Sequence, residues 1–168
     1  SALYKGYEVV GFRHGYNGLV DNEIEPLDIA RVKHIIQKGG TILKSARCIK
    51  FKSECGVKKA TEHLKQAKID ALIVIGGDGS LRGMLHLAEH WHGQLIGVPG
   101  TIDNDLSGSD FTIGFQTATE TVIEAIDKLR DTADAFERIF MVEVMGREAG
   151  FIALAAGIAS AAEQIIYP

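Results

Sequence analysis

A glycine-rich loop at residues 76–80 (GGDGS) follows an apolar run at residues 71–75 and precedes a helical pattern. Glycines there let the backbone approach a phosphate group, and the N–H groups at the start of a helix point toward it. Asp78, in the middle of the loop, could hold Mg²⁺ beside that phosphate. The alternative to a phosphate-binding loop is a tight strand-to-helix turn. An aspartate flanked by glycines argues against this alternative.

A second loop with acidic side chains, residues 99–105 (PGTIDND), follows the apolar run at residues 95–98. It places two carboxylates, Asp103 and Asp105, beside the hydroxyl of Thr101. A carboxylate at such a position could accept a proton from an attacking hydroxyl or bind a metal ion. Alternatively, the two aspartates could cap turns or the next helix through their side chains.

Two arginines complete a set of groups suited to phosphoryl transfer. Arg147 lies in residues 145–150 (MGREAG), at the start of a predicted helix, where a positive charge opposes the helix dipole and so suggests an anionic ligand. Arg47 follows another predicted strand. Arginines near paired aspartates and a glycine-rich loop are the groups that stabilise a transferring phosphoryl group. Either arginine alone could instead form a surface salt bridge.

A histidine-rich segment, HLAEHWH, ends the helical pattern that follows residue 80. His86 and His90 share one helix face and could bind a metal ion. The sequence favours a plainer interpretation, an exposed helix end before Gly93. Neither a GxGxxG dinucleotide motif nor a GxxxxGK[ST] phosphate loop is present.

Alternating strand-length and helix-length segments predict an α/β, Rossmann-like fold: three αβα layers around a mostly parallel sheet. Ligands of such sheets bind at the carboxyl ends of the strands, where the loops above lie. Strands are predicted at residues 7–12, 40–43, 71–75, 95–98, 138–144 and 164–167. Helices are predicted at residues 27–38, 57–67, 80–90, 115–132 and 148–162.

Composition narrows the function further. The 168 residues are 46% apolar and 24% charged with a net charge of −4, which is typical of a globular domain and argues against nucleic acid as a partner. Cys48 and Cys55 predict reduced thiols. Because no apolar stretch reaches membrane length and no leader pattern opens the chain, we expect a cytoplasmic protein without membrane contact.

Residues 1–6 look like the last turn of a helix and residues 164–167 like a strand, so we expect a larger protein around this chain.

The motifs GGDGS, PGTIDND and MGREAG, in this order, resemble those of the 6-phosphofructokinase family, as do GYNGL (15–19), GGTILKSAR (39–47) and TIGFQTA (112–118). GGDG alone also occurs in NAD kinases and diacylglycerol kinases, whereas PGTIDND after GGDGS is highly specific. The resemblance implies that residues 1–168 are part of a phosphofructokinase chain, mainly its ATP-binding domain. The family's first strand and its C-terminal substrate half would then be absent.

The resemblance further implies a glycolytic, allosterically regulated homotetramer that transfers the γ-phosphoryl group of ATP to the 1-hydroxyl of fructose 6-phosphate. Asp103 would be the base, with Thr101 and Asp105 beside it, and Arg47 and Arg147 would stabilise the transferring charge. Asp78 would bind Mg²⁺. The nucleotide would lie against Tyr16, Arg47, Cys48, Lys52, Gly77, Gly79, Ser80 and Gly83. The sugar phosphate would contact Met145, Gly146, Arg147 and, from a neighbouring subunit, Arg138.

Two glycines bear on the phosphoryl donor. Relatives that use pyrophosphate carry an aspartate where this chain has Gly79 and a lysine where it has Gly100. An aspartate at the first position would crowd and repel the α-phosphate of ATP. Glycine at both positions therefore resembles the ATP-dependent branch; the alternatives are a pyrophosphate-dependent relative and a non-catalytic nucleotide-sensing subunit of the same fold.

Overall fold

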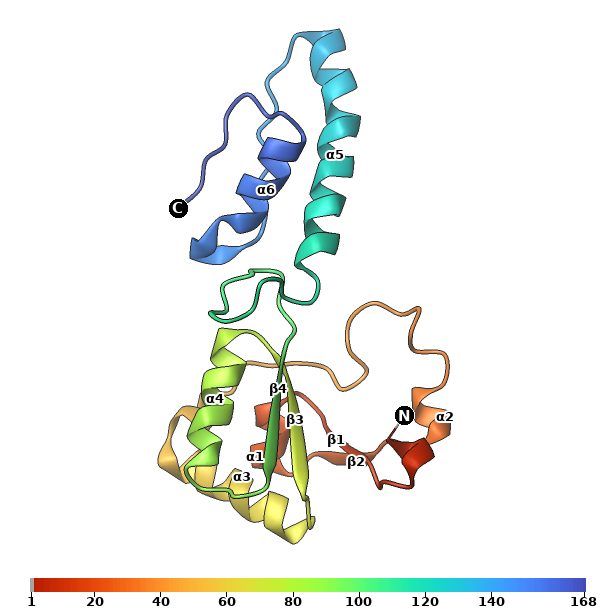
Figure 1. The fold of residues 1–168 in the computed structure, drawn as a ribbon, viewed down its shortest axis with the longest axis vertical. Coiled ribbons are helices and arrows are strands. Elements are labelled where there is room, and N and C mark those ends of the chain that lie inside the picture. The colour runs from red at the N-terminus through yellow and green to blue at the C-terminus, as the bar shows by residue number, and fades with distance from the viewer. Residues whose placement is uncertain (1) are drawn as a thin grey trace. The chain divides into compact units, whose positions relative to one another are not determined.

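The computed structural model describes residues 2–168 and divides the chain into two compact units. The first unit comprises the residues up to Leu72 together with Gly83–Leu95, and the second comprises Ile73–Arg82 with Ile96–Pro168. Figure 1 labels the helices and strands of both units. None of the described helices is long and apolar enough to cross a membrane.

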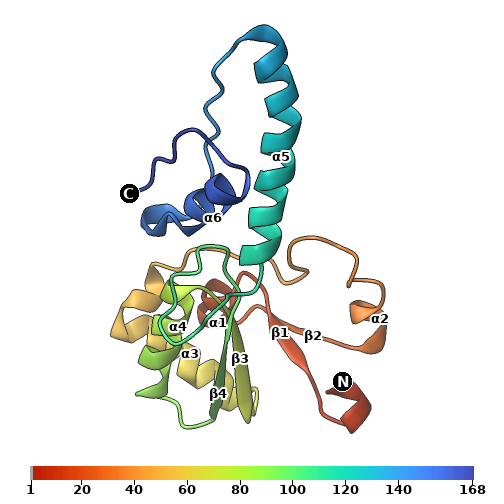
Figure 2. The ribbon, with the colours of Figure 1, turned by 45° about the horizontal axis from the view of Figure 1, so that its top comes forward.

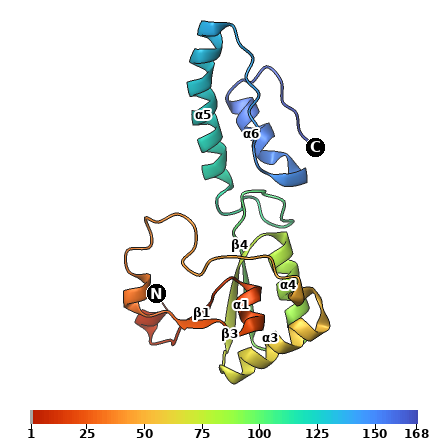
Figure 3. The same ribbon diagram turned by 180° about the vertical axis from the view of Figure 1, so that it is seen from behind.

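The hydrophobic core of the first unit is built mainly from helices. Helices α1 (Tyr16–Asp21) and α3 (Glu54–Gln66) lie beside each other, as Figure 3 shows, and the short η2 (Lys50–Lys52) leads into α3. Apolar residues recur at three- and four-residue steps along α3 and so form one buried face. The buried cluster consists of Leu19, Val20, Phe51, Val57, Ala60, Leu64, Leu87 and Trp91.

The N-terminal part of the first unit contains an antiparallel strand pair. Strand β1 (Val10–Phe12) pairs with β2 (Ile24–Pro26), as Figure 2 shows, and α2 (Ile29–Val32) follows. The predicted helix end is confirmed in the described part: η1 (Leu3–Lys5) ends at the left-handed Gly6, whose N–H donates to the Leu3 carbonyl. Residue 1 of that prediction lies outside the described residues.

A β–α–β segment carries the glycine-rich loop. Strands β3 (Ala71–Gly76) and β4 (Gln94–Pro99) pair in parallel, and α4 (Asp78–Ala88) connects them, as the alternation predicts. In the second unit, α5 (Phe115–Phe136) lies beside α6 (Phe151–Ala159), which η3 (Arg147–Ala149) precedes. The Arg130 guanidinium on α5 donates to the backbone carbonyls of Ser160 and Ala161, fixing the end of α6.

Several predicted elements are wrong. Residues 40–43 form a turn in which the Thr41 hydroxyl accepts from the Leu43 N–H, at 3.2 Å. Residues 138–144 and 164–167 form no strand: a strand needs a neighbour for its N–H and C=O groups, yet Ile139 is fully exposed. The helix predicted at residues 27–38 stops at Val32, and His34 has a φ of +58°. The described residues thus form two separate two-stranded sheets, the antiparallel β1–β2 pair and the parallel β3–β4 pair.

Candidate active site

The glycine-rich loop forms the predicted strand-to-helix junction. Strand β3 ends at Gly76, and the Gly77 carbonyl accepts from the N–H groups of Ser80 (3.0 Å) and Leu81 (3.1 Å), which closes the first turn of α4. A Cβ atom on Gly76 would lie 2.5 Å from Ser80 Oγ, so this packing excludes a side chain at residue 76. The N–H groups of Ser80 and Leu81 are thus used within the first turn of α4, and an anion at this helix start would be met by the N–H groups that precede them.

Residues 77 and 79 of this loop are both glycine, but the packing of the protein restricts a side chain only at residue 77. A Cβ on Gly77 would lie 3.3 Å from Thr101 Cβ, so the neighbouring loop packs closely against it. A Cβ on Gly79 would meet nothing within 4 Å. The described residues thus leave the space beside Gly79 open, and nothing in their packing requires glycine there.

Asp78 forms an ion pair on the surface of α4. Its carboxylate accepts from Arg82 Nε at 2.9 Å, one helical turn away, and its side chain remains 41% exposed. Sequence reasoning missed Arg82, although an acid and a base four residues apart on a helix are a recognisable signal. An exposed carboxylate at a helix start is an oxygen ligand that a solvated cation could reach.

The acidic loop is hydrogen-bonded to the glycine-rich loop. The Gly100 N–H donates to the Gly76 carbonyl at 3.1 Å, and a Cβ on Gly100 would lie 2.8 Å from Ile75 Cγ2. Further along, the Thr101 hydroxyl accepts from the Asp103 N–H at 3.2 Å. The structure therefore brings residues 76–80 and 99–103 together at the carboxyl ends of β3 and β4.

Asp103 is the more enclosed of the two predicted carboxylates. Its side chain is only 16% exposed, and Oδ2 lies 3.6 Å from Arg147 Nε. Asp105, by contrast, is exposed. The predicted base and one of the two predicted arginines are thus neighbours in the second unit, with the guanidinium still 67% exposed toward solvent.

Asn104, which sequence reasoning did not select, holds the acidic loop in shape. Its Oδ1 accepts from the backbone N–H (2.8 Å) and hydroxyl (3.2 Å) of the buried Thr112, and its Nδ2 donates to the Asp110 carbonyl (3.4 Å). Its φ of +52° lies in the left-handed region, which asparagine tolerates well. The sequence signal for this role was an asparagine between two aspartates in a loop, because asparagine side chains commonly hydrogen-bond to nearby backbone.

The third loop turns sharply around Arg147. Gly146 (φ +130°) and Gly150 (φ +66°) flank Arg147, whose own φ is +52°. A positive φ is uncommon for arginine, and residues with such strained backbone are found more often at functional sites.

The other predicted sugar-phosphate contacts differ in exposure. Met145 is 75% exposed and Gly146 is buried, while Arg138 lies over the Phe136 ring at 5.1 Å, in an exposed segment.

The remaining predicted nucleotide contacts belong to the first unit. Tyr16 stacks on Phe51, with ring centroids 4.0 Å apart, and a Cβ on Gly83 would lie 2.9 Å from the Tyr16 ring. Burial raises the pKa of Tyr16 above its usual range. Cys48 packs against the core cluster, whereas Arg47 is exposed.

The sequence matches known proteins along its whole length. The family profile described as Phosphofructokinase matches residues 1–168. A relative from Thermoanaerobacter sp. (strain X514), named ATP-dependent 6-phosphofructokinase, is 54% identical over 168 residues, which are 100% of this chain and 52% of the relative. The chain thus spans about half the length of the curated relatives it matches.

Two solved structures have the same fold over most of this chain. Phosphofructokinase from Saccharomyces cerevisiae is 37% identical with a TM-score of 0.87, over 99% of this chain and 25% of that one. A pyrophosphate-dependent phosphofructokinase from Marinobacter aquaeolei is 26% identical with a TM-score of 0.72, over 90% of this chain and 41% of that one. The described α/β arrangement is therefore part of the fold of these proteins.

Proposed function

The chain belongs to the phosphofructokinase family, and we propose that it is the nucleotide-binding part of an ATP-dependent 6-phosphofructokinase. The reaction would move the γ-phosphoryl group of ATP to the 1-hydroxyl of fructose 6-phosphate. One observation carries the proposal: an enclosed carboxylate, Asp103, lies beside the Arg147 guanidinium on a loop hydrogen-bonded to the glycine-rich start of α4. Curated relatives with this sequence pattern are named for that ATP-dependent activity.

In this proposal Asp103 is the general base. As the sugar oxygen forms its bond to the γ-phosphorus, its proton passes to the Asp103 carboxylate, and the bond between the γ-phosphorus and the ADP oxygen breaks. Transfer of a phosphoryl group depends chiefly on positioning and on charge stabilisation. Arg147, ion-paired to Asp103 yet exposed enough to meet a ligand, supplies positive charge to the transferring group.

The chain's residues fit the Mg²⁺ that accompanies ATP in such reactions. Asp78 offers a half-exposed carboxylate at the helix start, and Mg²⁺ is commonly held by one or two carboxylates together with substrate phosphates and water. When bound with the nucleotide, the ion supplies neutralisation of phosphate charge. Gly77, Gly79 and Ser80 would then lie along the phosphates.

We assign the remaining contacts as expected from the sequence. Thr101 and Asp105 would flank the base, while Met145, Gly146 and Arg138 would contact the sugar phosphate, Arg138 that of a neighbouring subunit in a tetramer. On the nucleotide side the proposal uses four residues of the first unit: Tyr16, Arg47, Cys48 and Gly83. The packing of Tyr16 on Gly83 supports a further role for this glycine in the core.

ATP as the donor is supported by the space at Gly79. Because a side chain there would meet no described atom within 4 Å, the packing of the protein does not explain glycine, whereas room for an α-phosphate does.

The reaction is a step of glycolysis, and the proposal places the protein in the cytoplasm. Since the chain spans about half of its relatives, we expect residues 1–168 alone to show little turnover.

The test is an assay of the complete reading frame that encodes these residues, purified and supplied with fructose 6-phosphate and either Mg-ATP or Mg-pyrophosphate. We expect fructose 1,6-bisphosphate with ATP only. Product with pyrophosphate alone would overturn the donor, and binding of Mg-ATP without turnover would favour a nucleotide-sensing subunit. Phosphorylation of NAD or of diacylglycerol in place of the sugar would overturn the reaction itself.

A further inference from the structure

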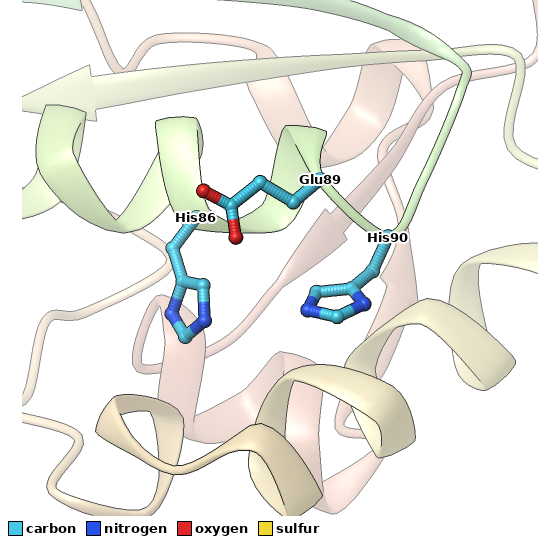
Figure 4. A group of neighbouring side chains, drawn as sticks. All are labelled: His86, Glu89 and His90. Carbon is cyan, nitrogen blue, oxygen red and sulfur yellow. The ribbon is translucent and has the colours of Figure 1, made fainter.

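Three metal-ligating side chains gather at the C-terminal end of α4, in the first unit. One ligand atom from each of His86, Glu89 and His90 lies within 4.8 Å of the others. The two imidazole rings meet edge to face, with centroids 5.8 Å apart. Figure 4 shows both rings on the same side of α4 and the Glu89 carboxylate extending back along the helix toward His86.

Buried neighbours hold the backbone of this cluster in place. The Leu87 carbonyl accepts from the N–H groups of His90 (3.0 Å) and Trp91 (2.9 Å), which makes one further turn after α4. Leu87 and Trp91 are both core residues, 0% and 4% exposed. Since Leu87 adjoins His86 and Trp91 adjoins His90, the backbone from which the two imidazoles extend is held by the core.

The Trp91 ring occupies the space beside Gly93, the residue at which the chain leaves the cluster. The Trp91 ring lies over Gly93, where a Cβ would come 2.2 Å from Trp91 Cζ2. This packing fixes the exit of the chain after His90. The two histidines are half-buried and Glu89 is exposed, so a cation from solvent could reach all three.

We propose that His86, Glu89 and His90 bind a divalent transition-metal ion of the zinc class. Zinc ligands lie roughly 2.0–2.2 Å from the ion, so tetrahedral ligand atoms are about 3.4 Å apart. The observed separations are within about 1.5 Å of this value, a difference that rotation of the side chains can close. Two imidazoles and a carboxylate leave a fourth position for water and favour Zn²⁺, Ni²⁺ or Cu²⁺ over Mg²⁺.

The bound ion would tie the last turn of α4 to the turn that leads into β4. Because His86 lies within α4 and His90 beyond its end, the ion would close the helix end and stabilise the folded chain. The site uses none of the residues assigned to phosphoryl transfer, and its existence does not depend on the proposed function.

Cobalt titration of the untagged chain tests the proposal, because Co²⁺ in a tetrahedral site gives visible d–d bands. We expect one Co²⁺ per chain, displaced by Zn²⁺ but not by excess Mg²⁺, and a higher melting temperature with Zn²⁺. His86→Ala and His90→Ala should each weaken binding by about tenfold or more, and Glu89→Gln by less. His92→Ala, at an exposed histidine outside the cluster, is the matched control.

Two results would overturn the site. The first is binding of equal strength in wild type and in the His86→Ala/His90→Ala double variant. The second is a thiolate-to-cobalt charge-transfer band, which would assign the ion to Cys48 or Cys55. If the alanine variants unfold by circular dichroism, His86→Gln/His90→Gln replaces them: its failure to weaken binding would count against the proposal in the same way.

Discussion

The Oδ2 atom of Asp103 lies 3.6 Å from the Nε atom of Arg147, although the two residues belong to different loops. Asp103 is mostly enclosed, while Arg147 is mostly open to solvent. An enclosed carboxylate beside a solvent-exposed guanidinium is suited to receive a proton next to a developing negative charge.

Replacing the carboxylate tests the assignment of the base. Asp103→Ser in the complete enzyme should lower kcat roughly 10²–10⁴-fold with ATP and fructose 6-phosphate, because the hydroxyl proton loses its acceptor. Steady-state kinetics measure this. Asp110→Ser is the matched control: Asp110 is an exposed acid of the same segment, and its backbone carbonyl accepts from Asn104. A kcat within about tenfold of wild type for Asp103→Ser would remove Asp103 from this role.

The hydrogen bonds of Asn104 should contribute measurably to stability. Asn104→Ala leaves the buried Thr112 groups without their acceptor, and we expect a loss of roughly 1–3 kcal/mol in the free energy of unfolding. Urea denaturation of the chain followed by circular dichroism gives this value.

Asn104→Gly separates the two causes of that loss, since glycine keeps the left-handed backbone without strain. The glycine variant should be more stable than the alanine variant by about 1 kcal/mol. If the free energy of unfolding of Asn104→Ala lay within about 0.5 kcal/mol of the wild-type value, these hydrogen bonds would not stabilise the fold.

Donor choice should depend on Gly79 without affecting the fold. Gly79→Asp should lower kcat/KM for ATP by about tenfold or more, through repulsion of the nucleotide phosphates, while its urea midpoint stays near that of wild type. Gly79→Ala, which adds a methyl group without charge, is the control for charge and should lower kcat/KM for ATP less than Gly79→Asp does. Equal use of ATP by wild type and Gly79→Asp would contradict the donor assignment.

Tyr16 should make the chain sensitive to alkali. Burial raises its pKa in the folded state, so above its ordinary pKa of about 10 the unfolded chain ionises first, and stability falls as the pH rises. Tyr16→Phe should reduce this alkaline loss, which urea denaturation between about pH 9 and 11 measures. The hydrogen bond from Lys50 to Asp21 raises the pKa of Lys50, so a second alkaline loss should persist in the variant.

Tyr4→Phe, at a side chain 96% exposed, is the control for this experiment and should leave the alkaline profile of wild type in place. An identical profile for Tyr16→Phe and wild type would show that Tyr16 ionises equally in the folded and unfolded chain.

Local pattern was enough to predict the long helices and the strands beside the site. Helices α3 and α5 follow from apolar residues at three- and four-residue steps, and β3 and β4 from apolar runs that end in glycine-rich loops. Helix α1 has only six residues and contains Gly18, whose added Cβ would lie 1.7 Å from the Arg13 carbonyl. Tertiary packing determines α1, so the sequence contains no periodic pattern of apolar residues from which this helix could be predicted.

The limits of sequence reasoning at the site have a similar physical cause. The position of Asp103 after β4 was expected, because strand ends share one edge of a parallel sheet. Residues 138–144, whose pattern suits a strand, form none, since strand formation depends on a neighbour that local sequence does not specify. Asn104 was missed because its partner, Thr112, lies eight residues away, whereas the four-residue spacing of Asp78 and Arg82 could have been read from the sequence.

The two glycines that bear on donor choice differ in how readily mutation could change them. In the genetic code one base separates a glycine codon from an aspartate codon, and at Gly79 the new side chain would enter empty space. A lysine at Gly100 would need at least two base changes and would also have to displace Ile75 Cγ2, 2.8 Å from its Cβ. If the proposed use of ATP holds, a lineage could weaken it in one step at residue 79, whereas the change at residue 100 would also require the Ile75 side chain to move.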